Sequence, residues 1–573
     1  MPNLFHTGKL ELIDPSIKLM PDSKKFPIPP CSLPPSWGIF PQTNSMNTPP
    51  SIFNDVLGPI MRGPSSSHSA AANRIGRLAR ALAGEKVVRM VVRYDPNGSL
   101  VTTHKEQGSD LGLYGGLLGW TPDDDRLPRY EAALQKEGIE IDLRYESFDA
   151  PHPNFYRLEL HGESGQSYDL DAISTGGGMI ETVAINGIPF ASAGDYYHLL
   201  FFGVEEPENI SDLASFEDCS THTDPVYGTV FNLSLREEPT AEEIARLTKA
   251  LKPKSVRLLP AVLPVLARKE IQVPFARAGE MMELAEKDGT PLWKMALRYE
   301  AERGGISEDE VMDKMDYIRT IMEAAIETGL GGTEYADRIL HSQSPGFQTA
   351  ENEGRLIPGD ISNAIIRSVT AIMEVKSSMG VIVAAPTAGS CGAMPGAVLA
   401  VAKALGKSDE EKNRALLLAG LIGVFITLDA TFAAEEGGCM AETGSGASMA
   451  AAALAWLAGG TNEQQMAAAS LALQNSFGLV CDPIANRVEA PCLGKNVMAA
   501  TNALSCANMA LANYQHLIPF DEVTLAMNKV AHQIPRELRC TNLGGLSITP
   551  TADRIAEKLA GKAGCGCGGK ISC

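Results

Sequence analysis

The pattern of apolar and polar positions changes along the chain, and the change predicts two structural classes in one molecule. Apolar and polar residues alternate in KVVRMVVRYDP (86–96) and FYRLELHGE (155–163), as in strands with one buried face. RIGRLARALAG (74–84) has helical spacing and ends in glycine. We expect residues 51–194 to form a mixed α/β domain, with STGGGMIE (174–181) as a tight turn between strands.

Residues 195–270 alternate between strand-like and helix-like segments. The predicted helices are ENISDLASF (208–216) and AEEIARLTKAL (241–251), and strand-like stretches precede, separate and follow them. The order approximates the βαββαβ pattern of a small α+β module, although one of the four strands gives no clear pattern.

From about residue 271 the chain is rich in Ala, Gly and Met and has helical periodicity. EDEVMDKMDYIRTIMEAAIETG (308–329) predicts a long helix with Gly329 as its C-terminal cap. ASMAAAALAWLAGG (447–460) predicts a helix whose small residues allow close packing. The predicted fold class is multidomain α+β, with a mixed α/β N-terminal domain, a small βαββαβ-like module and a large, mainly α-helical C-terminal domain.

These patterns divide the chain into five predicted segments. They are an irregular, Pro- and Ser-rich extension (1–50), the mixed domain (51–194), the small module with its linker (195–270), the helical domain (271–560) and a Cys- and Gly-rich tail (561–573).

Length and charge narrow the classes of function. A chain of 573 residues can hold three or four domains. Its net charge of -20 makes nucleic acids and anionic membranes poor partners. The N-terminus lacks a cationic start followed by an apolar stretch, and the longest apolar run (415–428) is too short to cross a bilayer. We therefore expect a cytoplasmic protein without a membrane span.

Eleven cysteines in a reducing compartment argue against a disulfide framework. Cys439, Cys481 and Cys492 all stand at helix-end or loop patterns, from which thiolates can converge. From the residues alone, buried structural cysteines and ligands of a metal or iron–sulfur cluster stay as alternatives. Cys391, on a Gly/Pro loop, competes as a ligand, and Cys506 lies in a helical pattern expected in the core.

A serine-rich loop, GPSSSHSAAANRIGR (63–77), precedes a predicted helix. Its hydroxyl groups and the helix N–H groups could bind a carboxylate, and His68 could act as a general acid or base. The alternative is a serine-rich helix cap with a hydrogen-bonded histidine. His152 lies between two prolines and is a second catalytic candidate, with a surface turn as its alternative; His104 is a further one.

Several stretches in order resemble the iron–sulfur L-serine dehydratases (L-serine ammonia-lyases), from about Ser51 to Ala560. The first half is similar to the family's β module and the second half to its α module, so the resemblance implies a fusion of the two. The stretches are SIFNDVLGPIMRGPSSSHSAAANRIGRLAR (51–80), HPN (152–154), STGGGMIE (174–181), APTAGSCGAMPG (385–396), GGCMAETGSGASMAAAAL (437–454), FGLVCDPIANRVEAPC (477–492) and LGGLSITPT (543–551).

The resemblance implies conversion of L-serine to pyruvate and ammonia by a [4Fe-4S] cluster, without pyridoxal phosphate (PLP). An iron without a protein thiolate would act as a Lewis acid for loss of the β-hydroxyl group. The chain would be a homodimer that binds a small amino acid. The implied site comprises cluster ligands Cys439, Cys481 and Cys492, with Cys573 able to reach the open iron; catalytic His68 and then His152; and substrate-binding Ser65, Ser66, Ser67, Asn154, Thr387 and Gly389.

The chain also departs from the family pattern. MEVK (373–376) replaces a common Asn-Glu-x-Asn, Glu435 and Glu436 replace part of Ala-Ser-Ile-Ser-Gly, and Cys540 stands where Glu is usual. The module at 195–270 is placed like an ACT domain but looks shortened. Two alternatives to serine turnover therefore stay open. One is the same elimination on threonine, cysteine or a larger hydroxy amino acid, and the other is a non-catalytic iron–sulfur sensor.

Overall fold

A six-stranded sheet forms the centre of the mixed domain in the computed structural model, which describes residues 48–204, 215–224 and 228–563. The strand order is β3-β2-β4-β5-β6-β7, with only β2 and β3 parallel. The bounds are β2 Val87–Tyr94, β3 Glu140–Tyr145, β4 Phe155–Gly162, β5 Ser167–Gly176, β6 Met179–Ile185 and β7 Ile188–Ser192, with helices α1 Ala71–Ala83, α2 Leu100–Thr103, α3 Ser109–Leu117 and α4 Tyr130–Glu137.

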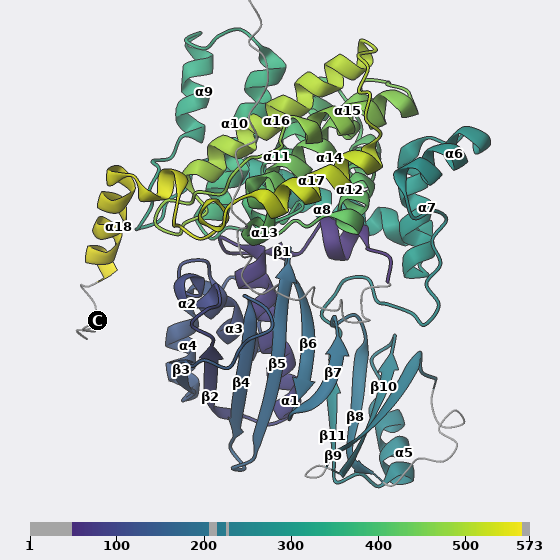
Figure 1. Ribbon diagram of the computed structural model, residues 1–573, viewed down its shortest axis with the longest axis vertical. Helices are drawn as coiled ribbons and strands as arrows, with labels where there is room; N and C mark the ends of the chain where they lie inside the picture. The colour runs from purple at the N-terminus through teal and green to yellow at the C-terminus, as the bar shows by residue number, and fades with distance from the viewer. Residues whose placement is uncertain (1–47, 205–214, 225–227, 564–573) are drawn as a thin grey trace, which may run out of the picture. The chain divides into compact units, whose positions relative to one another are not determined.

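Helix α1 packs against β4, β5 and β6, and α3 packs against α1 (Figure 1). The two helices touch at Gly76, where an added Cβ would lie only 2.1 Å from the Leu113 carbonyl oxygen. The predicted turn in STGGGMIE is confirmed: β5 ends and β6 begins there, and Gly176, Gly177 and Gly178 all have positive φ.

The small module has four strands in the order β11-β8-β10-β9, and all neighbours are antiparallel. This is the split β-α-β arrangement that the βαββαβ pattern predicts. The strand without a clear pattern is β9, an edge strand, DCSTHTD, that is almost wholly exposed and polar. The bounds are β8 Tyr197–Val204, β9 Asp218–Asp224, β10 Gly228–Leu235, α5 Ala241–Leu251 and β11 Ser255–Leu259.

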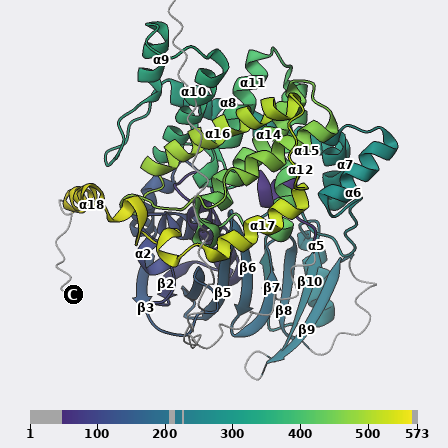
Figure 2. The same ribbon diagram turned by 45° about the horizontal axis from the view of Figure 1, so that its top comes forward.

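Thirteen helices, α6 to α18, follow within the described residues, and they confirm the predicted helical domain. From Ala415 to Ile426 helix α12 is apolar and buried on all sides, and α14 packs against α12, α15 and α16 (Figure 2). The bounds are α6 Ala278–Asp288, α7 Leu292–Gly304, α8 Glu308–Leu330, α9 Ser344–Asn352, α10 Asp360–Ser377, α11 Ala393–Ala404, α12 Asp409–Asp429, α13 Ala434–Cys439, α14 Ser445–Leu457, α15 Asn462–Gln474, α16 Ala490–Leu511, α17 Phe520–Gln533 and α18 Pro550–Ala563.

The prediction of Gly329 as a helix cap was wrong. Helix α8 continues through Gly329 to Leu330, and Gly331 follows it. A Cβ on Gly329 would lie 2.2 Å from the carbonyl oxygen of Ala371 in α10, so this glycine lets two helices pack backbone to backbone.

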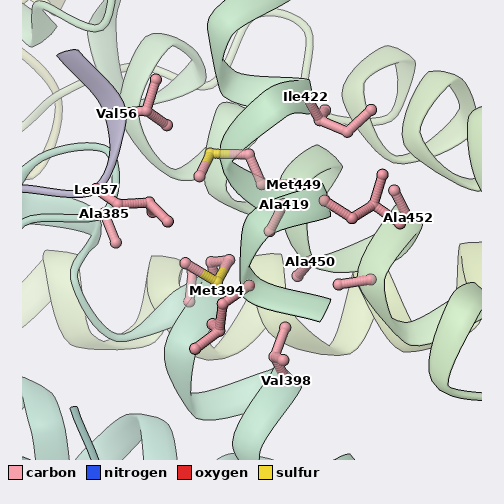
Figure 3. Packing of buried hydrophobic residues seen from close by; sticks show 14 of the residues in the cluster. Val56, Leu57, Ala385, Met394, Val398, Ala419, Ile422, Met449, Ala450 and Ala452 are labelled. Carbon is pink, nitrogen blue, oxygen red and sulfur yellow. The ribbon is translucent and has the colours of Figure 1, made fainter. Parts of the chain in front are cut away.

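The start of the mixed domain lies inside the helical core. Residues Ile52–Val56 form a π-helical turn, and Val56 and Leu57 lie among residues of α11, α12 and α14 (Figure 3). Gly420 and Gly423 of α12 make room for this turn, because a Cβ on Gly423 would lie 2.2 Å from Val56 Cγ1. Strand β1 (Ile60–Met61) then pairs with β12 (Ile382–Val383).

Several predicted segments lie wholly or mostly outside the described residues. They are the extension 1–50, the helix 208–216 and the cysteines of the tail, Cys573 included. Within the described part of the chain, no single helix is long and apolar enough to cross a membrane, although the bent pair Asp409–Asp429 and Ala434–Leu457 passes by length and composition.

Candidate active site

A pocket lies between segments of the mixed domain and of the helical domain. Its walls bring together the serine-rich loop, the loop after β12, helix α13 and the cysteine-bearing segments. The lining residues are Pro64, Ser65, Ser67, Gln107, Gly389, Ala434, Glu435, Glu442, Cys481, Pro483, Val488, Cys492 and Cys540.

His68 is held in the serine-rich loop, where Ser66–Ala70 form a π-helical turn that leads into α1. Its side chain is fully buried, with Nδ1 3.0 Å from Ser65 Oγ and Nε2 2.9 Å from Thr103 Oγ1. Nδ1 also lies 4.0 Å from Glu435 Oε1. Burial, with a smaller effect from His104, lowers the pKa of His68 to about 3, so the imidazole is neutral at pH 7.

The three serines have different positions. Ser65 and Ser67 line the pocket. Ser66 does not line it; its hydroxyl accepts a hydrogen bond from Ala388 N (3.2 Å), which joins the serine-rich loop to the helical domain. The Ser67 carbonyl oxygen accepts a hydrogen bond from Ser174 Oγ (2.6 Å) on β5.

Asn154 and His152 lie behind the pocket rather than in its lining. Asn154 accepts a hydrogen bond from Ser99 Oγ, and the Ser99 carbonyl oxygen accepts one from Thr103 Oγ1, the hydroxyl that contacts His68. His152 accepts a hydrogen bond from Asn154 N (3.0 Å) through Nδ1, and burial lowers its pKa to about 4. Asn154 is therefore connected to His68 only through Ser99 and Thr103, and its predicted contact with substrate stays a prediction.

The loop after β12 brings Thr387 and Gly389 next to a carboxyl group that the sequence patterns missed. Thr387 Oγ1 donates a hydrogen bond to Glu442 Oε1 (2.6 Å), and Gly389 lines the pocket beside the same carboxyl. A Cβ on Gly389 would lie 2.6 Å from Glu442 Oε1. Burial raises the pKa of Glu442 to about 7, so this group can hold a proton near neutral pH.

Glu435 is a second pocket carboxyl, and it occupies one of the positions where the sequence departs from the family pattern. Burial raises its pKa too. Lys376, at another such position, is fully buried and donates a hydrogen bond to the Val488 carbonyl oxygen, so it stands behind the lining. The serine-rich loop signalled a site in sequence, whereas Glu442 gave no such signal.

The three predicted cluster cysteines converge from three elements. Cys439 is the last residue of α13, Cys481 lies between α15 and α16, and Cys492 is the third residue of α16. All three are buried, and Cys481 and Cys492 line the pocket. Gly438 has a positive φ and packs closely against the segment before Cys481. An added Cβ at Gly438 would lie only 2.9 Å from the Leu479 carbonyl oxygen.

Cys540 is a fourth thiol at the same place. It belongs to one small apolar cluster with Ala434, Cys439 and Cys481. Hydrogen bonding with the Cys439 thiol, then with the Cys540 thiol, and burial raise the pKa of Cys481 well above its ordinary value. Cys391 is buried beside Met373 and does not line the pocket, and Cys506 is buried in α16 as expected.

The buried thiols at this site are the donor type that an iron–sulfur cluster takes. Among residues 48–204, 215–224 and 228–563, no three His, Cys, Asp or Glu side chains meet closely enough to hold one metal ion. A cluster of several irons is wider, and its ligands are thiolates, each on its own iron. Thiols with raised pKa values need a strong positive charge to become thiolates, and bound iron supplies one.

A lysine next to these thiols was also missed by the sequence patterns. Lys495 Nζ donates hydrogen bonds to the Val480 carbonyl oxygen (2.7 Å) and to Asp482, which holds the backbone on either side of Cys481. Burial alone would lower the pKa of Lys495, but the nearby Cys439 and Asp482 outweigh burial and raise the pKa above its ordinary value, which favours the charged form.

Known proteins are similar to both halves of the chain. The family model "Serine dehydratase alpha chain" matches residues 287–547. The probable L-serine dehydratase alpha chain of Bacillus subtilis (strain 168) is 36% identical over 289 residues, which are 50% of this chain and 96% of that protein. The alpha chain of the Peptoniphilus asaccharolyticus L-serine dehydratase is 38% identical over 279 residues, 48% of this chain and 96% of that one.

The probable beta chain from Bacillus subtilis is 39% identical over 150 residues, 26% of this chain and 66% of that protein. One polypeptide therefore carries segments similar to both chains, as the predicted fusion requires. Dehydratases are lyases, so this chain is an enzyme of the lyase class. With almost the whole length of two alpha-chain relatives matched, the chain belongs to the L-serine dehydratase family.

Proposed function

We propose that the protein is a cytoplasmic, [4Fe-4S]-dependent lyase that converts L-serine to pyruvate and ammonia without PLP, as a homodimer. The observation that carries the proposal is the convergence of Cys481 and Cys492 with Ser65, Ser67 and the neighbouring His68 at one pocket. Cysteines that serve only packing are not expected to line a pocket together with two hydroxyl groups, one of which contacts His68. Membership of the L-serine dehydratase family supports the same substrate.

Cys439, Cys481 and Cys492 would hold the cluster. When bound, it supplies Lewis acidity to the β-hydroxyl group of the substrate and makes hydroxide a better leaving group. Ser65 and Ser67 offer hydroxyl groups that can hydrogen-bond the substrate carboxylate and fix the orientation of Cα.

Proton transfer falls to His68 and Glu442. His68 contacts the pocket hydroxyl Ser65 through Nδ1, so a proton taken from Cα can pass to the imidazole through that hydroxyl. Glu442, with a pKa of about 7, can give a proton to the departing hydroxide, which leaves as water. The enamine so formed becomes an imine, which water hydrolyses to pyruvate and ammonia.

A second candidate keeps the elimination and changes the substrate. Glu435 and Cys540 both line the pocket, and both stand at departures from the family pattern. An added carboxyl and thiol in the lining could select threonine, cysteine or a larger hydroxy amino acid instead of serine.

The test is anaerobic purification followed by iron and sulfide analysis, a visible spectrum and a keto-acid assay on a panel of β-substituted amino acids. We expect a brown protein that forms pyruvate from L-serine. A protein that stays colourless after anaerobic reconstitution would refute the cluster proposal, whereas a brown protein without turnover on any substrate would favour a sensor.

Replacing one ligand tests whether turnover depends on cluster assembly. Cys481→Ser should abolish cluster assembly and turnover together, because it removes a buried thiolate. Cys506→Ser is the matched control, since Cys506 is equally buried but lies away from the pocket. A full cluster in Cys481→Ser would remove this residue from the ligand set.

The role of His68 is tested without disturbing the thiols. His68→Asn should keep the cluster but lose at least about a hundredfold in kcat, the usual effect of removing a general base. His532→Asn, at an exposed histidine of α17, is the control. Near-normal kcat in His68→Asn would contradict the acid–base assignment.

A further inference from the structure

Cys540 is built into the thiol site by its backbone. The Cys540 amide donates a hydrogen bond to the Ala434 carbonyl oxygen (3.3 Å), at the start of the helix that ends in Cys439. Its side chain lines the pocket with only 8% exposure. The thiol therefore faces the pocket that Cys481 and Cys492 also line, and it packs with Cys439 and Cys481.

The segment around Cys540 is fixed to the Cys481 loop on both sides. Cys481 N donates a hydrogen bond to the Leu538 carbonyl oxygen (2.9 Å), two residues before Cys540. After Cys540, Leu546 N donates to Asp482 Oδ2 (3.0 Å) and Ser547 Oγ donates to the Pro483 carbonyl oxygen (2.6 Å). The two thiols thus lie on one anchored unit, the arrangement expected for ligands of one group.

A polar side chain from the mixed domain also points at this sulfur. Gln107 Nε2 donates a hydrogen bond to Cys540 Sγ (3.7 Å), and Gln107 is 1% exposed. An amide N–H stabilises a thiolate more than a thiol, because the sulfur that accepts the bond then carries the charge. Hydrogen bonds of this kind to ligand sulfurs are a common feature of iron–sulfur sites.

We propose that Cys540 is a fourth thiolate ligand, on the iron that Cys439, Cys481 and Cys492 leave open, in the substrate-free enzyme. The proposal rests on the cluster of the proposed function. Binding of substrate would then displace the Cys540 side chain, which Gln107 would still hold in the pocket lining. One ligand bond would form for the one that breaks, and no electron would be transferred.

The test compares how firmly the fourth iron is held. An iron without a protein thiolate is lost on mild oxidation, which converts [4Fe-4S] to the paramagnetic [3Fe-4S] form. Anaerobic protein is treated with one equivalent of ferricyanide, and the [3Fe-4S] signal is followed by electron paramagnetic resonance together with iron per chain. Wild type should keep four irons, whereas Cys540→Ser should lose one at least about tenfold faster, within the range for altered ligand shells.

Three further proteins make the outcome decisive. Cys506→Ser, the buried control, should behave as wild type, and Gln107→Ala should lose iron at an intermediate rate with all thiols present. Equal rates of iron loss in wild type and Cys540→Ser would overturn the proposal, as would a change in Cys573→Ser instead, which would assign the ligand to the tail. Failure of Cys540→Ser to assemble any cluster would also overturn it, because a fourth ligand is dispensable for assembly. A wild type without cluster would refute the proposed function itself.

Discussion

Glu442→Gln should change how the stability of the protein depends on pH. Burial raises the pKa of Glu442 from an ordinary 4.5 to about 7. The folded protein therefore binds this proton more tightly than the unfolded chain, and protonation favours folding at low pH. This contribution is complete below about pH 4.5 and is lost as the pH rises through about 7.

The size of the effect follows from the shift. A difference of about 2.5 pH units corresponds to about 3 kcal/mol. The Glu442 side chain is partly exposed in the pocket, and water there screens part of the cost. We expect the glutamine variant to gain about 1 to 3 kcal/mol relative to wild type between pH 4.5 and pH 8. Glutamine can still accept the hydrogen bond from Thr387, so that contact does not confuse the comparison.

The assay is urea unfolding of cluster-free protein across this pH range. Because a chain of this size unfolds in more than one step, the quantity compared is the midpoint of each protein at each pH. Glu436→Gln, which removes an exposed carboxylate nearby, is the control and should track wild type. A difference between Glu442→Gln and wild type that stays constant with pH would refute the assignment of a raised pKa.

Two further predictions concern a helix contact and a buried amide at the site. Gly329→Ala should destabilise the protein by about 2 kcal/mol, because overlap with Ala371 outweighs the gain of about 1 kcal/mol in helix propensity. Gly346→Ala, in a helix with open space around it, should be neutral or stabilising, and the opposite order of urea midpoints would contradict the packing argument. Asn496→Ala should cost about 3 kcal/mol and slow cluster reconstitution, because this buried amide bonds the Gly389 and Cys492 carbonyl oxygens (2.8 Å each). An unchanged midpoint and reconstitution rate would show that water replaces it.

Elements with a strong period could be predicted from the sequence, whereas those defined by tertiary contact could not. The alternation in β2 and β4 and the helical spacing in α1 and α8 predicted both the kind of element and its position in the chain. β9 has no apolar face, so only its pairing with β10 makes it a strand. Gly329 shows the same limit, since a glycine near a helix end suits a cap and a close helix contact equally well.

Some residues of the candidate site could likewise be predicted from local sequence, whereas others could not. The serine-rich loop and Cys481 stand outside long helices and strands, and Cys492 stands in the first turn of α16, where local patterns signal chemistry. Glu442 sits among small helical residues, and its raised pKa depends on burial, which local sequence does not report. Cys540 could be noted only as an unusual residue, since its neighbours Cys439 and Cys481 are far away in the chain.

The turn at Ile52–Val56 has a consequence for how the molecule could be divided. Its side chains fill space between α12 and α14, and β1 pairs with β12, so the first residues of the mixed domain complete the helical core. A break in the polypeptide near residue 270 would leave these contacts intact. Two co-expressed fragments should therefore reassemble without the peptide connection between them.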